Sequence, residues 1–150
     1  MKHAVSIRPN EGLEVLEEYC FRCSEIRRLV LPSSVKSIGS DAFNECKHLT
    51  CADLSAAYGL KCLETQTFMW CKNLRHVLLN DGLETIRGSC FGNCGIEEIA
   101  IPSSVRYVDC YAFSTKSLKR VRFLGTESRH DGSRPAPESR TDSSCVRGDS

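Results

Sequence analysis

Cysteine is the residue type with the clearest capacity for chemistry in this 150-residue chain, which contains ten of them. Two pairs have spacings like those of metal ligands: Cys20 and Cys23 are separated by Phe-Arg, and Cys90 and Cys94 by Phe-Gly-Asn. Either pair could hold zinc, and the first also has the C-x-x-C form of a redox-active disulfide.

Other kinds of catalytic site have less support. The sequence contains no glycine-rich loop of the kind that binds phosphate, and no Ser–His–Asp set has a recognisable local context. The histidines are scattered along the chain, at His3, His48, His76 and His130. We therefore predict that the protein is not an enzyme and uses no cofactor.

A repeat accounts for the cysteine spacing without a metal. Phe21, Phe43, Phe68, Phe91 and Phe113 are 22, 25, 23 and 22 residues apart. Each has an aliphatic residue eight positions and another five positions before it, and each is followed by a block of the form L-x-x-V-x-L. A period of this length is typical of solenoids, in which each unit covers the apolar side of the next.

Most of the cysteines occupy fixed positions in this repeat. Four lie two or three residues after the phenylalanine, and two take a position that is alanine in other units; these are Cys23, Cys46, Cys71 and Cys94, and Cys20 and Cys90. Because a free cysteine packs as a small hydrophobe, we interpret them as thiols that fill the core. The two candidate ligand pairs are three units apart, about 14 Å at the usual strand spacing, which is too far to share one ion. We predict no bound metal; thiol or metal chemistry remains the alternative, with Cys51 as an exposed, reactive candidate.

The L-x-x-V-x-L block alternates as a short strand does. In the block that begins at residue 74, we place Leu74, Val77 and Leu79 inside and the residues between them toward solvent. Pro-Ser-Ser or Asn-Asp-Gly then turns the chain, a second apolar pair follows, and a compact turn around the phenylalanine has room for one turn of helix. The stretch ADLSAAYGL adds about two residues to one unit and should bulge at a turn.

The chain divides into a solenoid and a tail. Residues 1–12 read as a partial first coil and residues 13–125 as five repeats, so residues 1–125 form one domain. Residues 126–150 contain Val146 as the one apolar residue beyond Ala, Pro and Cys. Because this segment cannot bury enough surface to offset the entropy of ordering it, we predict a disordered C-terminal tail.

Residues 26–46 and 96–113 carry the fullest pattern, L-x-x-I-x-I-P-x-S-V-x-x-I-G-x-x-A-F-x-x-C. This pattern resembles the BspA-like (Treponema-type) leucine-rich repeat family over about three-quarters of the chain. The resemblance implies a β-rich α/β fold, a right-handed leucine-rich repeat solenoid of about five coils of 22–25 residues, with its strands on the concave side. It also implies binding rather than catalysis. Members are often microbial surface proteins that contact host matrix or cells, so one alternative is a fragment or spacer of a cell-surface adhesin.

The outward positions of the strands predict where a partner protein of unknown identity would bind. Their charge changes sign from one coil to the next, which suits a protein of mixed charge better than a nucleic acid, whose backbone favours a uniform basic strip. The candidate contacts are Arg28, Val30, Asp53, His76, Leu78, Glu97, Glu98, Arg120 and Arg122.

Charge and hydropathy limit the other partners. The net charge is +1, and no apolar run approaches the length of a membrane span, so we predict neither nucleic-acid binding nor membrane insertion. The first residues lack the apolar stretch of a signal peptide. This predicts a cytoplasmic protein if the N-terminus is complete, and a cell-surface protein if the chain is a fragment of an adhesin.

Two further expectations concern the ends of the chain. The final residues Arg147, Gly148, Asp149 and Ser150 resemble the tetrapeptide that integrins recognise in matrix proteins, although an incidental match is the simpler interpretation. Neither end of the repeat array has an obvious polar capping unit. Because open sheet edges can pair with other chains, self-association through the ends is a second expectation.

Overall fold

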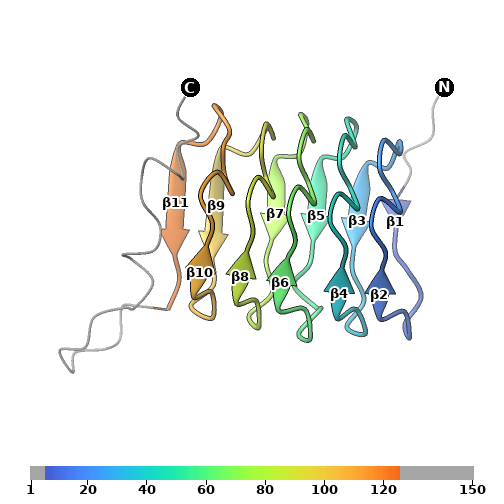
Figure 1. Ribbon diagram of the computed structural model, residues 1–150. Coiled ribbons are helices and arrows are strands. Elements are labelled where there is room, and N and C mark those ends of the chain that lie inside the picture. The colour runs from blue at the N-terminus through green and yellow to red at the C-terminus, as the bar shows by residue number, and fades with distance from the viewer. Residues whose placement is uncertain (1–5, 126–150) are drawn as a thin grey trace.

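The strands of this protein stack side by side along a solenoid, and every pairing between them is parallel (Figure 1). The structure is a computed structural model that describes residues 6–125. The strands are β1 (Ser6–Ile7), β2 (Val15–Leu16), β3 (Arg28–Val30), β4 (Ser37–Ile38), β5 (Cys51–Asp53), β6 (Cys62–Leu63), β7 (His76–Leu78), β8 (Thr85–Ile86), β9 (Glu98–Ile101), β10 (Tyr107–Val108) and β11 (Arg120–Phe123). The predicted leucine-rich repeat solenoid is confirmed.

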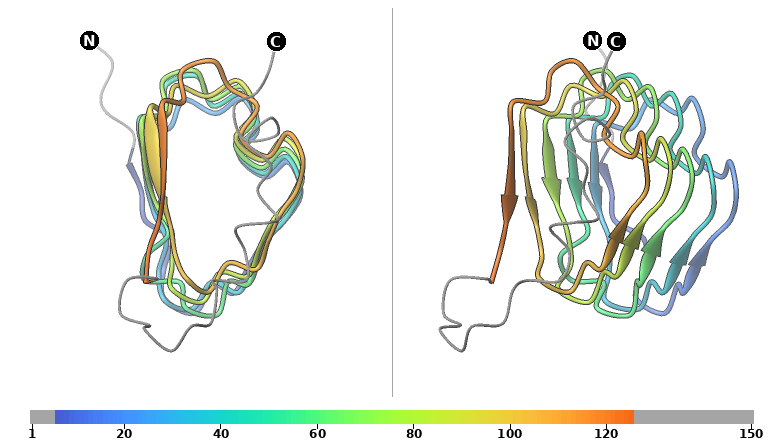
Figure 2. Two further views of the ribbon diagram at one scale, coloured as in Figure 1. Left: turned by 90° about the vertical axis from the view of Figure 1, so that its left-hand side faces the viewer. Right: turned by 60° about the vertical axis from the view of Figure 1, so that its left-hand side comes forward.

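Each coil has three sides, which superimpose when the solenoid is viewed along its axis (Figure 2). The odd-numbered strands form one side and the even-numbered strands a second. The third side is the turn that carries the repeat phenylalanine, which we call the Phe turn. The predicted alternation of the L-x-x-V-x-L block is confirmed, because Leu74, Val77 and Leu79 are buried whereas His76 and Leu78 are exposed.

Five phenylalanine rings form one column through the core. The ring centroids are 5.4, 5.2, 5.5 and 5.2 Å apart from Phe21 to Phe113, and successive ring planes differ by 7° or less. The rings of Phe43, Phe68 and Phe91 are fully buried. This offset stacking is a favourable geometry for aromatic pairs, so each coil contributes both apolar burial and ring contact to its neighbour.

The Phe turn is not helical, although the sequence left room for a turn of helix there. In the first four coils, the residues two before and two after the phenylalanine have positive φ, for example Asp41 and Glu45 around Phe43, each with φ of 59°. Around Phe113, Tyr111 has positive φ but Thr115 does not. No helix is assigned anywhere in residues 6–125. A right-handed helix requires negative φ at every residue, so alternating left-handed residues exclude it.

The alternation of left-handed and right-handed residues sends the backbone N–H groups of the Phe turn in two directions, some to carbonyls of the same coil and the others to carbonyls of the next coil. Residues just before and after the phenylalanine bond three residues back within the coil, as Asn44 does to Asp41. The phenylalanine and the residues two away donate to the next coil: the N–H of Phe43 bonds the carbonyl of Thr67 at 2.9 Å, and that of Phe68 bonds Cys90 at 2.8 Å. The Phe turns therefore form a hydrogen-bonded ladder whose donors all point toward the C-terminal end.

Both strand sides, by contrast, are interrupted once within the described residues. The odd-numbered strands are bonded in the order β1-β3-β5-β7, and β9 pairs with β11 but not with β7. The even-numbered strands form β2-β4 and β6-β8-β10. The interruption between β4 and β6 follows the predicted insertion, which forms a turn between β5 and β6.

The interruption between β7 and β9 coincides with a shortened connection. Gly95 alone separates Cys94 from Ile96, whereas two residues separate Cys71 from Leu74 in the preceding coil. A Cβ atom added to Gly95 would lie 2.5 Å from the carbonyl oxygen of Lys72. Glycine therefore lets this connection pass directly over the preceding coil.

Four of the six repeat cysteines are buried, as predicted for core filling, and three of their thiols also make hydrogen bonds. The prediction is wrong for Cys20 and Cys23, which are exposed because their Phe turn is the first one within the described residues and no preceding Phe turn covers it. Cys46, Cys71, Cys90 and Cys94 are buried, and none of the nine cysteines within residues 6–125 is in a disulfide. The thiols of Cys46, Cys71 and Cys94 donate to the carbonyl of the phenylalanine in the preceding coil, at 3.1, 3.1 and 3.0 Å. A thiol at this position therefore satisfies a buried carbonyl as well as filling space.

Several expectations concern residues that lie wholly or partly outside the described range. Residues 126–150, predicted to be disordered, lie outside them, as do Arg147, Gly148 and Asp149. Of the partial first coil at residues 1–12, the described part includes β1, which pairs with β3. Residues 6–125 contain no helix that is long and apolar enough to cross a membrane.

Candidate functional site

The candidate site is the outward surface of the odd-numbered strands, which we call the strand face. The register aligns Arg28, Cys51 and His76 in one column and Val30, Asp53 and Leu78 in the next. It also aligns Arg120 with Glu98 and Arg122 with Ala100 in the last two strands. All nine residues predicted as partner contacts lie on or directly beside these strands and are exposed or partly exposed: Arg28, Val30, Asp53, His76, Leu78, Glu97, Glu98, Arg120 and Arg122.

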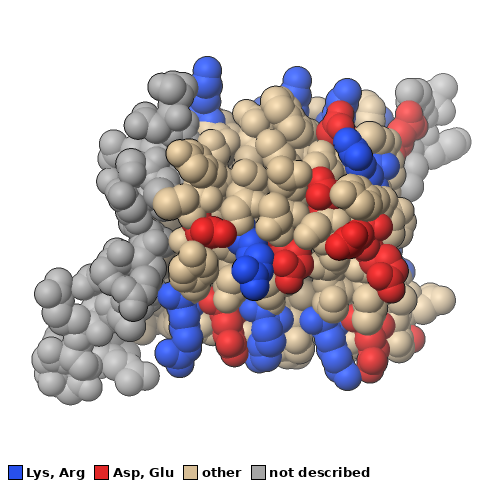
Figure 3. All heavy atoms as spheres, in the orientation of Figure 1, with Lys and Arg blue, Asp and Glu red and all other residues tan. Residues whose placement is uncertain are grey.

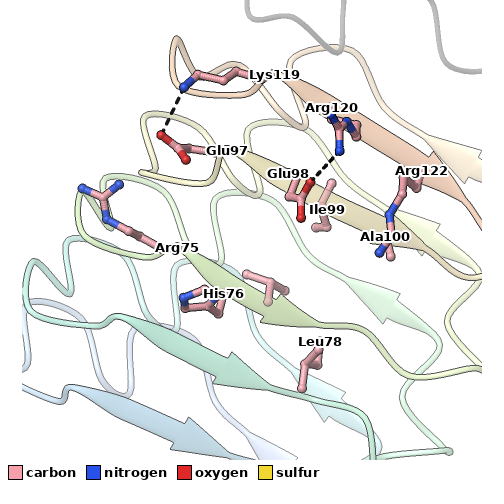
Figure 4. A pocket seen from close by; sticks show the side chains of 11 residues that line it. Arg75, His76, Leu78, Glu97, Glu98, Ile99, Ala100, Lys119, Arg120 and Arg122 are labelled. Carbon is pink, nitrogen blue, oxygen red and sulfur yellow. Dashed lines mark hydrogen bonds and ion pairs between the residues drawn. The ribbon is translucent and has the colours of Figure 1, made fainter.

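An open groove of about 460 Å³ lies across the interruption between β7 and β9 (Figure 4). We call it the main groove. Val77 and Ile99, both nearly buried, line it together with Leu78, whose side chain is 53% exposed. Arg75 and Arg122 also line it. Six of the nine predicted contacts therefore share this groove, namely His76, Leu78, Glu97, Glu98, Arg120 and Arg122.

Two ion pairs join the coils of β9 and β11 on one side of the main groove. Lys119 lies 3.4 Å from Glu97, and Arg120 lies 3.4 Å from Glu98 (Figure 4). All four side chains are more than half exposed, so water screens these pairs and each is expected to stabilise the fold by less than about 1 kcal/mol. The four charges can therefore change partners at little cost to the fold.

A second groove of about 420 Å³ borders the strand face where the chain enters strands β3, β5 and β7. We call it the entry groove. Arg27, His48 and Arg75 line it, together with Thr50, Asn73 and His76, and none of its lining residues is acidic. His76 and Arg75 line both grooves, so the two form one continuous surface.

The three predicted contacts outside the main groove lie on β3 and β5. Arg28 and Val30 are on β3, and Asp53 is on β5, where its carboxylate accepts bonds from the backbone N–H and hydroxyl of Ser55 at 3.0 and 2.6 Å. Sequence reasoning missed His48 and Asn73 as lining residues. Both lie between the Phe turn and the strand, where the repeat pattern is not periodic and gives no orientation.

Metal-binding side chains do not come together within residues 6–125: no group of three or more His, Cys, Asp or Glu residues is placed to hold an ion there. Cys20 and Cys23 are exposed on the first coil, whereas Cys90 and Cys94 are buried. Burial raises the pKa of the Cys94 thiol to about 12 and that of Cys90 well above its usual value. The buried pair is therefore protonated at neutral pH, which disfavours both metal ligation and nucleophilic reaction.

Comparison with known families identifies the repeat. The family model described as the BspA type leucine rich repeat region (6 copies) matches residues 52–128, just over half of the chain. The chain belongs to this family. The coil of a BspA-type repeat is thus the unit that places one row of outward side chains on the strand face.

Solved structures show the same architecture over most of this BspA-type chain. A leucine-rich repeat protein from Bacteroides ovatus ATCC 8483 is 25% identical, with a TM-score of 0.72, over 79% of this chain and 33% of that one. The leucine rich repeat protein of T. pallidum is 28% identical, with a TM-score of 0.71, over 79% of this chain and 58% of that one.

A leucine rich cell surface protein from Faecalibacterium prausnitzii A2-165 shares the fold, at 24% identity and a TM-score of 0.72 over 97% of this chain and 35% of that one. No curated protein sequence matches the chain. The chain spans about a third of the length of the Bacteroides and Faecalibacterium proteins and 58% of the T. pallidum protein.

Proposed function

We propose that this BspA-type repeat protein is a non-catalytic interaction module that binds a partner protein along the strand face. The observation that carries the proposal is the main groove, which gathers exposed charged and apolar side chains from three strands over a rigid, stacked core. Solenoids present such extended faces because successive coils repeat the same outward positions at a fixed spacing. Burial of Cys46, Cys71, Cys90 and Cys94 within the core supports a structural role for these four residues, and hence a non-catalytic protein.

Reversing the charges of Glu97 and Glu98 tests the strand face. The Glu97→Lys, Glu98→Lys variant removes two exposed ion pairs and changes the charge of the main groove by four units, while leaving the buried core untouched. We expect the unfolding free energy to fall by no more than about 2 kcal/mol, since exposed pairs contribute little. We expect the proteins captured by the full-length chain, measured by quantitative mass spectrometry, to change.

The matched control reverses two acidic residues that also form exposed ion pairs between coils but lie on the side of the even-numbered strands. Glu14 pairs with Lys36 at 2.8 Å, and Glu64 pairs with Arg87 at 3.2 Å. The Glu14→Lys, Glu64→Lys variant should capture the same proteins as the wild type. A chain that ends at residue 125 tests the tail and its Arg147-Gly148-Asp149 motif in the same experiment. If capture is unchanged by the strand-face variant, the proposal is wrong.

A second candidate function is that the chain forms one segment of a longer cell-surface adhesin, in which it spaces other binding regions. Two observations favour it: the chain spans about a third of the length of two of the similar structures, and one of these is named as a cell surface protein. The genomic sequence around the coding region tests this. Further repeats and a signal peptide in frame upstream would support the adhesin and a surface location, and an in-frame stop codon directly upstream would exclude it.

A further inference from the structure

We propose that the strand face recognises an acidic, extended protein segment that places at least one apolar side chain on Leu78. This inference rests on the proposed function, and it adds the chemistry of the partner. It follows from which charges on the strand face are already neutralised by the fold and which are not.

The strand face carries an excess of positive charge. Its outward positions hold six cationic and three acidic side chains, although the net charge of the whole chain is +1. The cationic residues are Arg27, Arg28, Arg75, Lys119, Arg120 and Arg122, and the acidic residues are Asp53, Glu97 and Glu98. A partner segment of negative charge is therefore attracted to this surface before any contact forms.

All three acidic side chains already have partners within the fold. Glu97 and Glu98 pair with Lys119 and Arg120, and Asp53 accepts two bonds from Ser55. A basic ligand would therefore have to displace a cation or a hydroxyl that is already in place.

Four arginines of the strand face have no such partner. The guanidinium groups of Arg27, Arg28, Arg75 and Arg122 form no hydrogen bond or ion pair with any residue in the range 6–125. Each guanidinium offers a planar fork of donors that matches a carboxylate. The unused binding capacity of the strand face is thus cationic, and it suits Asp and Glu side chains.

The opposite side of the solenoid differs from the strand face in how its charges are balanced. Over the even-numbered strands, Lys and Arg side chains lie interspersed with Asp and Glu (Figure 3). Ion pairs there include Lys36 with Glu14 at 2.8 Å and Arg87 with Glu64 at 3.2 Å. Because those charges are locally balanced, the cationic excess marks the strand face and is not a general property of the surface.

The exposed side chain of Leu78 favours a partner segment that carries an apolar side chain. The Leu78 side chain is 53% exposed on β7, and it lines the main groove together with the nearly buried Val77 and Ile99. Covering this exposed leucine with an apolar side chain of the partner removes apolar surface from water and so favours binding. A nucleic acid backbone would bring no such apolar group, so an acidic peptide with an apolar side chain fits better.

The coil spacing sets the geometry of such a segment. Neighbouring rings of the phenylalanine column are 5.2 to 5.5 Å apart, so Arg75 and Arg122, which belong to coils two steps apart, are separated by about 11 Å along the solenoid axis. An extended chain advances about 3.3 Å per residue. Arg122 also occupies the strand position of Leu78, three residues beyond that of Arg75, which adds an offset of about 10 Å along the strand direction. Acidic residues about four to five apart in a segment that crosses the strands obliquely could therefore reach both arginines.

Fluorescence anisotropy with synthetic probes tests the inference on the full-length protein. The principal probe is a labelled nine-residue peptide of alternating Glu and Asp around a central Leu. The comparison probes have the same design with Lys and Arg in place of the acids, with Ser in place of the Leu, and a single-stranded DNA of equal charge. We expect the acidic Leu peptide to bind most tightly, with an affinity that falls as salt rises.

Variants then give effects of opposite sign. Arg75→Glu with Arg122→Glu should weaken binding of the acidic Leu peptide about three- to tenfold, the scale of two exposed ion pairs. Glu97→Lys with Glu98→Lys should strengthen it, because two acids are replaced by cations and two further cations are released. Leu78→Ser should weaken binding of the Leu peptide but not of the Ser peptide.

The control variant reverses two cations off the strand face. Lys61 and Arg106 are exposed, and neither forms an ion pair within the described residues. Lys61→Glu with Arg106→Glu should leave peptide affinity unchanged apart from a small effect of net charge. Equal weakening by the control variant, tighter binding of the basic peptide, or tighter binding of the DNA would each overturn the inference. If natural partners are lost with the Glu97/Glu98 variant while no acidic peptide binds, the proposed function stands and the partner chemistry is wrong.

Discussion

One interior position shows how single residues serve this fold. The residue directly before the phenylalanine is Ala42, Thr67, Cys90 or Ala112 in the four coils after the first, and all four are buried. The position therefore requires a small side chain and tolerates a hydroxyl or a thiol. Cys90 therefore fits this position as a small side chain, without any need for a metal or a disulfide.

Burial of a thiol makes the unfolding free energy depend on pH in the alkaline range. An unfolded cysteine loses its proton near pH 9, whereas burial raises the pKa of Cys90 well above that value. Between these two pKa values the unfolded state binds fewer protons than the native state, so stability falls as pH rises. We expect Cys90→Ala to lower the unfolding free energy by about 1 kcal/mol at pH 7. It should also make the loss of stability between pH 8 and 10.5 shallower.

Urea unfolding at several pH values measures this effect. The control is Cys23→Ala, because the Cys23 side chain is exposed. Its stability should follow that of the wild type as pH rises. Parallel pH curves for Cys90→Ala and the wild type would show that burial of Cys90 has no part in the alkaline loss.

The Phe turn is the element that the sequence described least well. The spacing of the phenylalanines predicted a compact turn and the column of rings, and both are confirmed. The left-handed residues on either side could not be predicted, because the residues that adopt this conformation share no type: Tyr19, Asp41, Gln66, Ser89 and Tyr111 occupy one of the two positions. The ladder between coils stabilises a conformation that none of these residues favours alone.

Gln66 allows a test of this conformation. Its φ is 59°, and its N–H donates to the carbonyl of Gly88 at 3.1 Å in the next coil. A β-branched side chain is strongly disfavoured at positive φ, so Gln66→Val should lower the unfolding free energy by about 1–2 kcal/mol, measured by urea denaturation. Gln66→Gly should cost much less, because glycine adopts this conformation readily.

The neighbouring residue provides the control for that experiment. Thr65 is exposed and is not among the residues with positive φ, so Thr65→Val should be close to neutral and Thr65→Gly mildly destabilising. If valine is tolerated equally at both positions, the left-handed conformation of Gln66 is not a requirement of the turn.

At the scale of the whole molecule, the coils touch only their neighbours, so stability should depend on their number. A duplicate of residues 83–104 inserted after Ser104 adds one complete coil with its own phenylalanine. Because each added interface buries another ring, we expect a higher unfolding free energy and an m-value in urea greater by about a fifth. A Gly/Ser-rich insertion of equal length at the same point should instead lower stability, and equal effects of the two insertions would contradict additive stacking.

The candidate site was predictable in outline but not in shape. Period-two alternation placed the nine candidate contacts on one surface, because a strand directs alternate side chains to opposite faces. The groove itself depends on the interruption between β7 and β9, and the spacing from Phe68 to Leu74 is only one residue longer than that from Phe91 to Ile96. The same one-residue difference separates the coils of β3 and β5, which remain paired. Such a difference looks like ordinary variation in a repeat, and its effect appears only when two particular coils are stacked.

The ladder of the Phe turns has a direction, and this matters while the chain is being made. The backbone N–H groups of each Phe turn donate hydrogen bonds to carbonyls of the following coil. Those of Tyr19, Phe21 and Cys23 donate to Ser40, Ala42 and Asn44. The ribosome synthesises the N-terminal coils first. Each newly synthesised segment can therefore bond to the free backbone N–H groups of the preceding Phe turn, which fix its register and its orientation. We therefore expect the coils to stack in the order in which they are synthesised, with each folded coil fixing the register of the next.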